Sequence, residues 1–198
     1  MKLFLVDRKP ELLDAWRKGF AGISDVVVTD EDIFALGADA IVSPANSFGF
    51  MDGGIDHQIS ERMGWHIQEA VRKAIRARPL GELLVGEALV VPTGDARTPW
   101  LIAAPTMRVP MRISQSINAY LAMKAVLLAA RAHREEVPIN SVACCGLGTG
   151  IGKLPFAIAA AQMAQAYAEI VQGDFTPPAS FGEAQKRQIR LNPDASLS

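Results

Sequence analysis

Glycines alternate with other residues in the segment CCGLGTGIGKLP, residues 144–155, at positions 146, 148, 150 and 152. Glycine allows positive φ and leaves no Cβ between the backbone and a ligand, so successive N–H groups of such a loop can point into one concavity. Pro155 suits the first turn of a following helix, whose N-terminus adds free N–H groups and a positive dipole end. The pattern predicts an anion site, most simply for phosphate. The structural alternative is a tight turn between a strand and a helix.

Two common nucleotide-binding motifs do not fit this second glycine loop, which we define as residues 146–154. A P-loop requires a glycine where Leu147 stands and a Ser or Thr where Leu154 stands. The dinucleotide-binding pattern G-x-G-x-x-G also fails, because the glycines alternate strictly. The loop therefore predicts phosphate binding without assigning a nucleotide-binding class.

A first glycine loop, residues 52–56, has the sequence DGGID and precedes a helical pattern. Acids at a helix start act as caps and dipole partners, so Asp52 and Asp56 are open to that structural interpretation. Asn46 lies where the preceding apolar segment ends. Its amide either satisfies a turn or is directed at a ligand hydroxyl.

Alternating apolar and amphipathic segments must position these loops. Strands are expected at 2–7, 25–30, 38–44, 82–94, 99–107 and 139–146, and helices at 10–22, 54–77 with a break near Gly64, 114–133 and 155–172. Continuous apolar strands separated by helices predict an α/β fold, a buried sheet with helices on both faces. Ligands of such sheets bind at the carboxyl ends of strands, where residues 43–54 and 146–154 lie. We therefore expect the two glycine loops to face each other across one cleft.

The chain of 198 residues is long enough for one well-filled domain. The helical and strand patterns end near Gly173, so we expect a single domain over residues 1–172. Residues 173–198 are polar, contain Pro-Pro and lack a period, which predicts a C-terminal tail with Phe175 or Phe181 as its docking residue.

Composition excludes several classes of protein. The formal net charge of −1 gives no overall electrostatic case for general nucleic-acid binding. No segment approaches the roughly 20 apolar residues of a membrane span, and the apolar start before Asp7 is too short for a signal peptide. The adjacent Cys144 and Cys145 and the scattered histidines match no metal-ligand spacing. We expect a cytoplasmic protein with reduced thiols and without a metal, a cofactor or a membrane partner.

The segment ADAIVSPANSFGFMDGGIDHQI resembles the signature of macrodomains, the ADP-ribose-binding family that includes Appr-1″-p processing proteins, in a bacterial or phage-type variant. The family pattern is a strand end D-A-I-V-N-A-A-N, a glycine-rich loop and V/I-D opening a helix. Residues 39–56 match it with Ser43-Pro44 in place of Asn-Ala, and residues 148–155, GTGIGKLP, resemble the family loop S-T-G-I-[YF]-G-[YF]-P. The resemblance covers about residues 1–172. It implies a three-layer α/β/α sandwich with a mixed, mostly parallel central sheet of about six strands.

The resemblance also implies roles for individual residues. Asp32 and Ile33 match the adenine-reading pair, with Glu31 in place of the family's glycine; a surface turn acid is the alternative for Asp32. Asn46 matches the asparagine at the distal ribose, and Asp56 matches the acid of hydrolytic members, so both are candidate catalytic residues. The first diphosphate loop corresponds to Gly53, Gly54 and Ile55, and the second to Gly148, Thr149, Gly150, Ile151 and Gly152.

Some positions depart from the family pattern or leave alternatives open. Gly152 and Leu154 stand where the family often has aromatic residues that pack on the distal ribose, and Phe48 or Phe50 either replaces them or belongs to the core. Lys153 either pairs with phosphate or lies in solvent. The same choice is open for Arg108 and Arg112 after another expected strand end, where Thr106 and Met107 are expected to border the cleft.

The resemblance implies a nucleotide-binding protein of ADP-ribosylation chemistry, with ADP-ribose or an ADP-ribosylated substrate as its partner. The expected activity is that of a hydrolase cleaving an ADP-ribosyl or O-acetyl-ADP-ribose linkage at C1″ of the distal ribose. Two alternatives remain: a non-catalytic ADP-ribose or nucleotide-binding module, and a phage-associated protein with a repurposed pocket. The sequence leaves the linkage, the acceptor and the oligomeric state undetermined.

Overall fold

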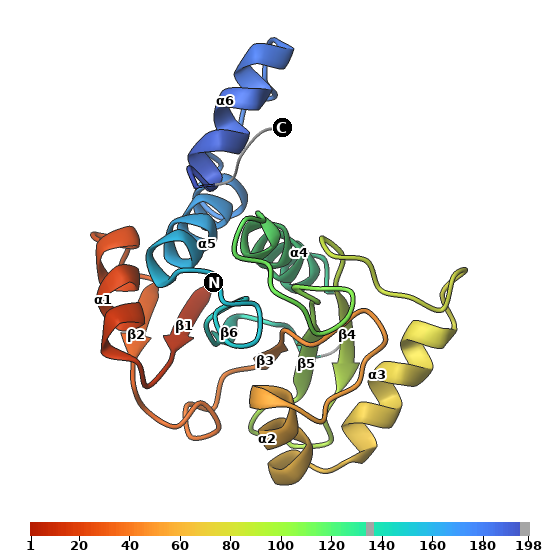
Figure 1. Ribbon diagram of the computed structural model, residues 1–198. Coiled ribbons are helices and arrows are strands. Elements are labelled where there is room, and N and C mark those ends of the chain that lie inside the picture. The colour runs from red at the N-terminus through yellow and green to blue at the C-terminus, as the bar shows by residue number, and fades with distance from the viewer. Residues whose placement is uncertain (134–136, 195–198) are drawn as a thin grey trace.

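Six strands form one mixed sheet in the order β2-β1-β6-β3-β5-β4 (Figure 1). The structure is a computed structural model that describes residues 1–133 and 137–194. The strands are β1 (Lys2–Val6), β2 (Val26–Thr29), β3 (Ala40–Ser43), β4 (Leu89–Pro92), β5 (Trp100–Ala103) and β6 (Ser141–Cys144). The edge strand β4 pairs antiparallel with β5, whereas the other pairs are parallel. The carboxyl ends of β1, β6, β3 and β5 therefore lie along one edge of the sheet.

Helices cover both faces of this sheet, so the predicted three-layer α/β/α sandwich is confirmed (Figure 1). On one face, α1 (Pro10–Gly19), α4 (Asn118–Ala132) and α5 (Phe156–Ile170) share a hydrophobic cluster with the strands. On the other face, α2 (Gly54–Met63) and α3 (His66–Arg76) pack in a second cluster. Alternate strand residues serve opposite faces, as Leu5 and Val6 of β1 do.

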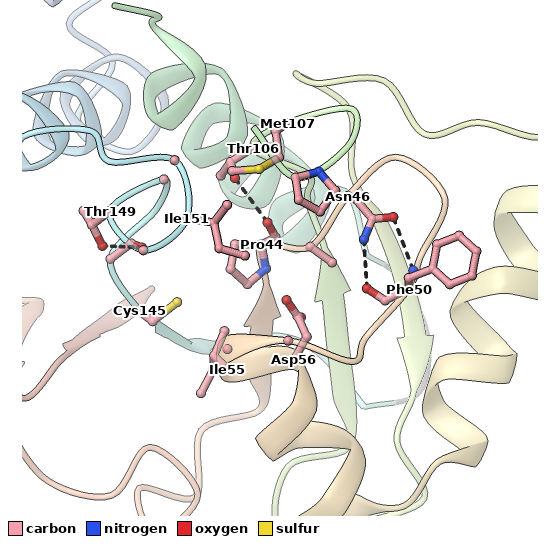
Figure 2. A pocket seen from close by; sticks show the side chains of 18 of the residues that line it. Pro44, Asn46, Phe50, Ile55, Asp56, Thr106, Met107, Cys145, Thr149 and Ile151 are labelled. Carbon is pink, nitrogen blue, oxygen red and sulfur yellow. Dashed lines mark hydrogen bonds between the residues drawn. The ribbon is translucent and has the colours of Figure 1, made fainter. Parts of the chain in front are cut away.

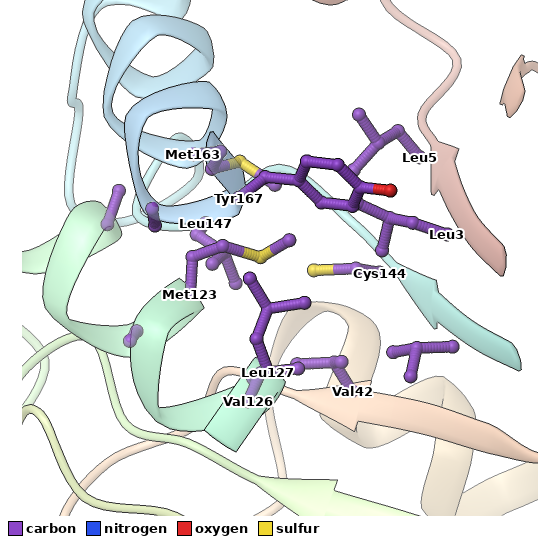
Figure 3. Close-up of a cluster of buried hydrophobic side chains, with 14 of the residues drawn as sticks. Leu3, Leu5, Val42, Met123, Val126, Leu127, Cys144, Leu147, Met163 and Tyr167 are labelled. Carbon is purple, nitrogen blue, oxygen red and sulfur yellow. The ribbon is translucent and has the colours of Figure 1, made fainter. Parts of the chain in front are cut away.

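The first cluster is dense and apolar, as expected for strands buried on both faces (Figure 3). Leu3, Leu5, Val42 and Cys144 come from three neighbouring strands and are buried. They meet buried side chains of α4, α5 and the second glycine loop, namely Met123, Val126, Leu127, Leu147, Met163 and Tyr167. This packing fixes the strand ends from which the glycine loops leave the sheet.

The predicted break in the helical stripe near Gly64 is confirmed. Gly64 ends α2 with φ +107°, a conformation that favours glycine, and α3 begins at His66. Ile59 of α2 and Ile67 of α3 are both fully buried on the same face of the sheet. The apolar spacing thus predicted the helical stripe, and Gly64 predicted the break that separates α2 from α3.

Two sequence predictions differ from the structure outside this core. The strand predicted over 82–94 is limited to β4, because residues 82–88 are irregular and turn at Val85-Gly86, where Gly86 has φ +96°. The tail contains an additional helix, α6 (Phe181–Leu191), which extends away from the sandwich (Figure 1). It was missed because it has no buried face. Local bonds support it instead: Ser180 caps the Glu183 N–H, and Glu183 pairs with Arg187 one turn later.

The tail docks through a polar residue rather than through Phe181, which is 78% exposed. Asn192 is buried, and its Nδ2 donates to the carbonyls of Ser114 and Ser116. Phe175 is half-exposed, with Lys124 Nζ 5.0 Å from its ring centroid. A search for apolar residues cannot find a contact made by hydrogen bonds, so the docking residue Asn192 was not predicted from the sequence.

Candidate functional site

A cleft of about 260 Å³ lies at the carboxyl edge of the sheet, where β3 and β6 end side by side (Figure 2). One wall follows β3 and consists of Pro44, Ala45, Asn46, Phe50 and Asp52 to Asp56. The opposite wall follows β6 and consists of Cys145, Gly146, Gly148, Thr149, Gly150, Ile151 and Gly152. Asp7, Lys9, Thr106, Met107 and Pro110 complete the lining. Segments about ninety positions apart in the sequence thus face each other, as the strand-end argument predicted.

The predicted site residues fall into this cleft and one adjoining pocket. Asn46, Asp56 and the predicted residues of both glycine loops all line the cleft. Asp32 and Ile33 line a second pocket of about 230 Å³. The two cavities share Asp7, Ile55 and Cys145, so together they form one elongated depression along the strand ends.

The first glycine loop presents free backbone donors to the cleft. Within the described part of the chain, the N–H groups of Gly53, Gly54 and Ile55 have no hydrogen-bond partner, as expected at the start of α2. A Cβ built on Gly53 or Gly54 meets no atom within 4 Å. The space beside these amides is open, and the α2 dipole makes it favourable for an anion.

The second glycine loop uses its glycines for two different purposes. A Cβ on Gly152 would lie 2.5 Å from the Gly148 carbonyl oxygen, and one on Gly148 would lie 2.8 Å from Ile113 Cδ1. A Cβ on Gly146 would lie 2.5 Å from Thr149 Oγ1. These three glycines are required by close packing, whereas a Cβ on Gly150 meets nothing within 4 Å. The structural alternative therefore explains much of the glycine pattern, and Gly150 is the position left open to a ligand.

Backbone donors of the second loop also remain available. The N–H groups of Gly148, Thr149, Gly150 and Ile151 have no partner among the described residues. The carbonyls of Gly148 and Gly150 instead accept from residues 154 and 153, which closes the turn. Ile151 is 59% exposed and projects between the walls (Figure 2). Two groups of unpartnered amides therefore line one cleft from opposite sides.

The side-chain amide of Asn46 closes a turn, which is the first of the two roles considered from the sequence. Its Oδ1 accepts from the N–H groups of Phe48 and Phe50 at 3.1 and 3.3 Å, and its Nδ2 donates to the Phe50 carbonyl at 2.9 Å (Figure 2). An amide nitrogen carries two hydrogens, so one donor remains for another partner. Asn46 thus shapes the wall and retains a single N–H for a ligand.

Asp56 is a buried acid in the first turn of α2. Its side chain accepts a hydrogen bond from Ser43 Oγ at 2.5 Å, and both residues are buried. Burial raises the pKa of Asp56 to about 7, with a smaller contribution from Asp52, whereas the bond from Ser43 acts in the opposite direction. The carboxyl group therefore changes its charge near neutral pH.

The second pocket combines acidic and basic groups. Asp32 Oδ1 accepts from the Phe34 N–H, and Oδ2 accepts from Arg62 Nη1 at 2.5 Å. The Phe34 amide and then Arg62 lower the pKa of this carboxyl group, so it is ionised at neutral pH. The Ile33 N–H has no partner among the described residues. The Asp32 carboxylate and the Ile33 N–H therefore place a hydrogen-bond acceptor beside a hydrogen-bond donor.

Several lining residues were not predicted from the sequence. Asp7, Lys9 and Cys145 follow β1 and β6, and they enter the site because β6 lies next to β3 and β1 lies next to β6 in the sheet. Lys9 is the one Lys or Arg among the described residues that line the main cleft. Its Nζ lies 5.2 Å from the Phe156 ring centroid at the start of α5. The polar residues that follow the first predicted strand, Asp7 to Lys9, were the feature of the sequence that could have indicated this part of the site.

The open alternatives after β5 are partly resolved. Thr106 and Met107 line the cleft as expected. Arg108 does not, because its guanidinium bonds both carboxylate oxygens of Glu82 and lies over the Phe48 ring. Phe50 borders the cleft and is half-exposed. Lys153 is exposed on the second loop with φ +53°.

Searches for two further kinds of feature gave no candidates in the part of the chain that is described. No group of three or more His, Cys, Asp or Glu is arranged to hold a metal ion there. None of the helices formed by residues 1–133 and 137–194 is both long and apolar enough to cross a membrane.

Comparisons with known proteins give a consistent result. The family model described as Macro domain matches residues 42–163. An uncharacterized protein of Aquifex aeolicus is 34% identical over 141 residues, covering 71% of this chain and 79% of the relative. One of Aeropyrum pernix is 34% identical over 148 residues, covering 75% and 72%.

Solved structures share the fold. The macrodomain of Mycobacterium tuberculosis DarG has a TM-score of 0.60 and 25% identity, covering 71% of this chain and 88% of that one. The Oceanobacillus iheyensis macrodomain with ADP has a TM-score of 0.60 and 20% identity, covering 73% and 75%.

Proposed function

Because the chain belongs to the macrodomain family, we propose that its cleft binds ADP-ribose and that Asp56 supports hydrolysis of an ADP-ribosyl linkage. One observation carries the proposal: two groups of unpartnered main-chain amides face each other across a cleft that also contains a buried acid. A diphosphate fits such a site, since its oxygens accept hydrogen bonds and its charge is favoured at the α2 N-terminus.

The two cavities suit different parts of the ligand. In the second pocket, the Asp32 carboxylate would accept from the adenine amino group, and the Ile33 N–H would donate to a ring nitrogen. The diphosphate would lie between Gly53, Gly54 and the open position at Gly150. The distal ribose would then lie against the wall that contains Asn46 and Asp56. The shared lining residues of the two cavities support a single elongated ligand.

Asp56 suits the role of general base in the proposed hydrolysis. Its carboxylate takes a proton from water as the water oxygen bonds C1″ of the distal ribose. The bond from C1″ to the acceptor breaks, and the acceptor leaves with the electron pair and takes up a proton. A base with a pKa near the working pH combines adequate ionisation with proton affinity. Amide contacts to the diphosphate hold C1″ in place, which contributes through positioning.

A non-catalytic ADP-ribose-binding module is the second candidate. Asp56 is 6% exposed, and Asn46 uses most of its hydrogen-bonding capacity within its own turn. Both observations limit contact with a reacting ribose and favour a pocket that binds without cleaving. A repurposed pocket is the third candidate, because Gly152 and Leu154 replace the aromatic residues expected near the distal ribose.

Calorimetry against ADP-ribose, ATP and NAD separates the third candidate from the others. We expect ADP-ribose to bind with a Kd on the order of micromolar and ATP to bind more weakly. Absence of heat with all three ligands would contradict ADP-ribose binding and favour a repurposed pocket.

A product assay separates the first two candidates. Purified protein is incubated with ADP-ribosylated protein, ADP-ribosylated nucleic acid or O-acetyl-ADP-ribose, and released ADP-ribose is quantified. Release identifies a hydrolase and the linkage it cleaves, whereas binding without release identifies a module. Because Cys144 and Cys145 are both free thiols, the assay is run under reducing conditions, in keeping with the cytoplasmic location we expect.

A further inference from the structure

We propose that Ser43 is a positioning residue for Asp56, fixing one carboxylate oxygen and favouring the ionised form of the acid. Ser43 stands where the family pattern has asparagine, so the contact belongs to this chain's own departure from that pattern. The expected effect on turnover rests on the proposed hydrolysis. The effect on the ionisation of Asp56 does not.

The geometry of the pair is fixed by two rigid elements. Ser43 is the last residue of β3, fully buried, and its carbonyl accepts from the Ala104 N–H at 2.9 Å. Asp56 lies in the first turn of α2 and lines the cleft. The Ser43 hydroxyl donates to Oδ1 at 2.5 Å, and Oδ2 has no side-chain donor among the described residues. The bond therefore holds one oxygen of the carboxyl group, Oδ1, in a fixed position beside the cleft.

Burial and a neighbouring acid oppose the ionisation of Asp56, whereas its own backbone N–H and the Ser43 hydroxyl favour it. Asp52 precedes it in the same loop, while Asp7 and Cys145 follow β1 and β6 and line the same cleft. The Asp52 carboxylate repels a further negative charge, and burial raises the pKa of the Cys145 thiol, which stays neutral. Lys9 is the one Lys or Arg among the described residues that line the cleft. The hydroxyl of Ser43 is thus the side-chain donor that favours the charged form of Asp56.

Ser43→Ala removes this donor and tests the proposal. We expect the pKa of Asp56 to rise by about one unit, because a hydrogen bond to a charged group has roughly that effect. The acid limb of the kcat profile moves to higher pH by the same amount. At pH 7 kcat falls roughly fivefold, in proportion to the ionised fraction. The KM and the affinity for ADP-ribose stay within about twofold.

The chain offers a matched control. Ser47, four residues after Ser43, is also buried, but its hydroxyl has no partner among the described residues. Ser47→Ala should leave the pH profile and the pKa of Asp56 unchanged. Ser43→Thr keeps the hydroxyl and should restore the wild-type pH profile, which a role limited to packing would not explain.

The decisive measurement is independent of catalysis. Titration of the Asp56 carboxyl carbon by ¹³C NMR gives its midpoint in wild type, Ser43→Ala and Ser47→Ala. A midpoint that rises only in Ser43→Ala supports the proposal, whether or not the protein releases ADP-ribose. An unchanged midpoint, or an equal shift in both alanine variants, overturns it. Absence of product release by the wild type would instead count against the proposed hydrolysis.

Discussion

In the first glycine loop, Gly53 and Gly54 both border open space, whereas in the second loop Gly150 alone of the four glycines does so. The other three are held against Ile113, Thr149 or the loop's own backbone. The first loop also brings an acid, Asp56, on a rigid helix, while the second contributes amides and packing. The comparison teaches that glycine content alone overestimates the number of ligand contacts. Under the proposed function, the acid would act from the first loop, while amides of both loops would bind the diphosphate.

Loss of the acid should have the largest effect. In Asp56→Ala we expect turnover to fall by roughly 10²–10⁴-fold, the range for removal of a general base, while ADP-ribose still binds. Asp52→Ala is the matched control, because this exposed acid lies in the same loop without the buried contact. Equal rates for Asp56→Ala and wild type would remove Asp56 from the mechanism and leave the two loops chemically equivalent.

The buried acid should also make stability depend on pH. The pKa of Asp56 is about 7 in the folded protein, against 3.8 as its ordinary value. The folded state therefore binds more protons between these values. Its contribution to stability is fully present below about pH 4 and is lost as the pH rises towards 7, by at most roughly 4 kcal/mol.

Asp56→Asn removes the titration while keeping an acceptor for Ser43. We expect the variant to have a higher Tm than the wild type at pH 8 and a similar Tm at about pH 4, measured by calorimetry. Parallel Tm curves for the two proteins across this range would show that burial of the charge has no energetic consequence.

Glycine-to-alanine substitution should distinguish closely packed glycines of the second loop from the glycine that borders open space. Gly152→Ala is expected to destabilise the fold by about 1–3 kcal/mol, because the new Cβ would lie 2.5 Å from a backbone oxygen. Gly150→Ala should unfold at the wild-type urea concentration, since its Cβ meets nothing within 4 Å. Equal midpoints for the two variants would mean that the loop relaxes around both.

The same open position should govern ligand affinity. Gly150→Val places a branched side chain into the space beside the free amides, and we expect ADP-ribose affinity to fall about tenfold, equivalent to about 1.4 kcal/mol. Calorimetry on the folded variant measures this directly. Wild-type affinity in Gly150→Val would show that the second loop does not approach the diphosphate. Binding of the diphosphate would then be assigned to the first loop alone.

Most of the fold was predictable because its strands and helices carry strong apolar patterns. The stripe containing Ile59, Ile67 and Val71 predicted helix on both sides of Gly64, and the glycine itself predicted the break. Helix α6 was not predictable in this way, since its stability comes from the Ser180 cap and an exposed ion pair. An apolar period reports burial, and this helix buries no residue.

The site was predictable where residue type itself is restrictive. The paired glycine loops and Asp56 could be located from the sequence, and the cleft contains all of them. The bond from Ser43 to Asp56 and the closed turn of Asn46 could not, because both depend on side-chain directions. Asp7, Lys9 and Cys145 could not be assigned either, since strand order is not visible in a single sequence.

Lys9 is one of these unassigned residues, and it gives the smallest effect. As the cation of the cleft among the described residues, it should attract the diphosphate by about 1 kcal/mol, so Lys9→Met should weaken ADP-ribose binding roughly fivefold at low salt. Salt should reduce this difference, because the interaction is partly screened. Lys153→Met is the control, since Lys153 is exposed on the second loop outside the cleft lining. A loss of affinity in Lys153→Met but not in Lys9→Met would reverse the assignment and place the charge, as well as the amides, on the second wall.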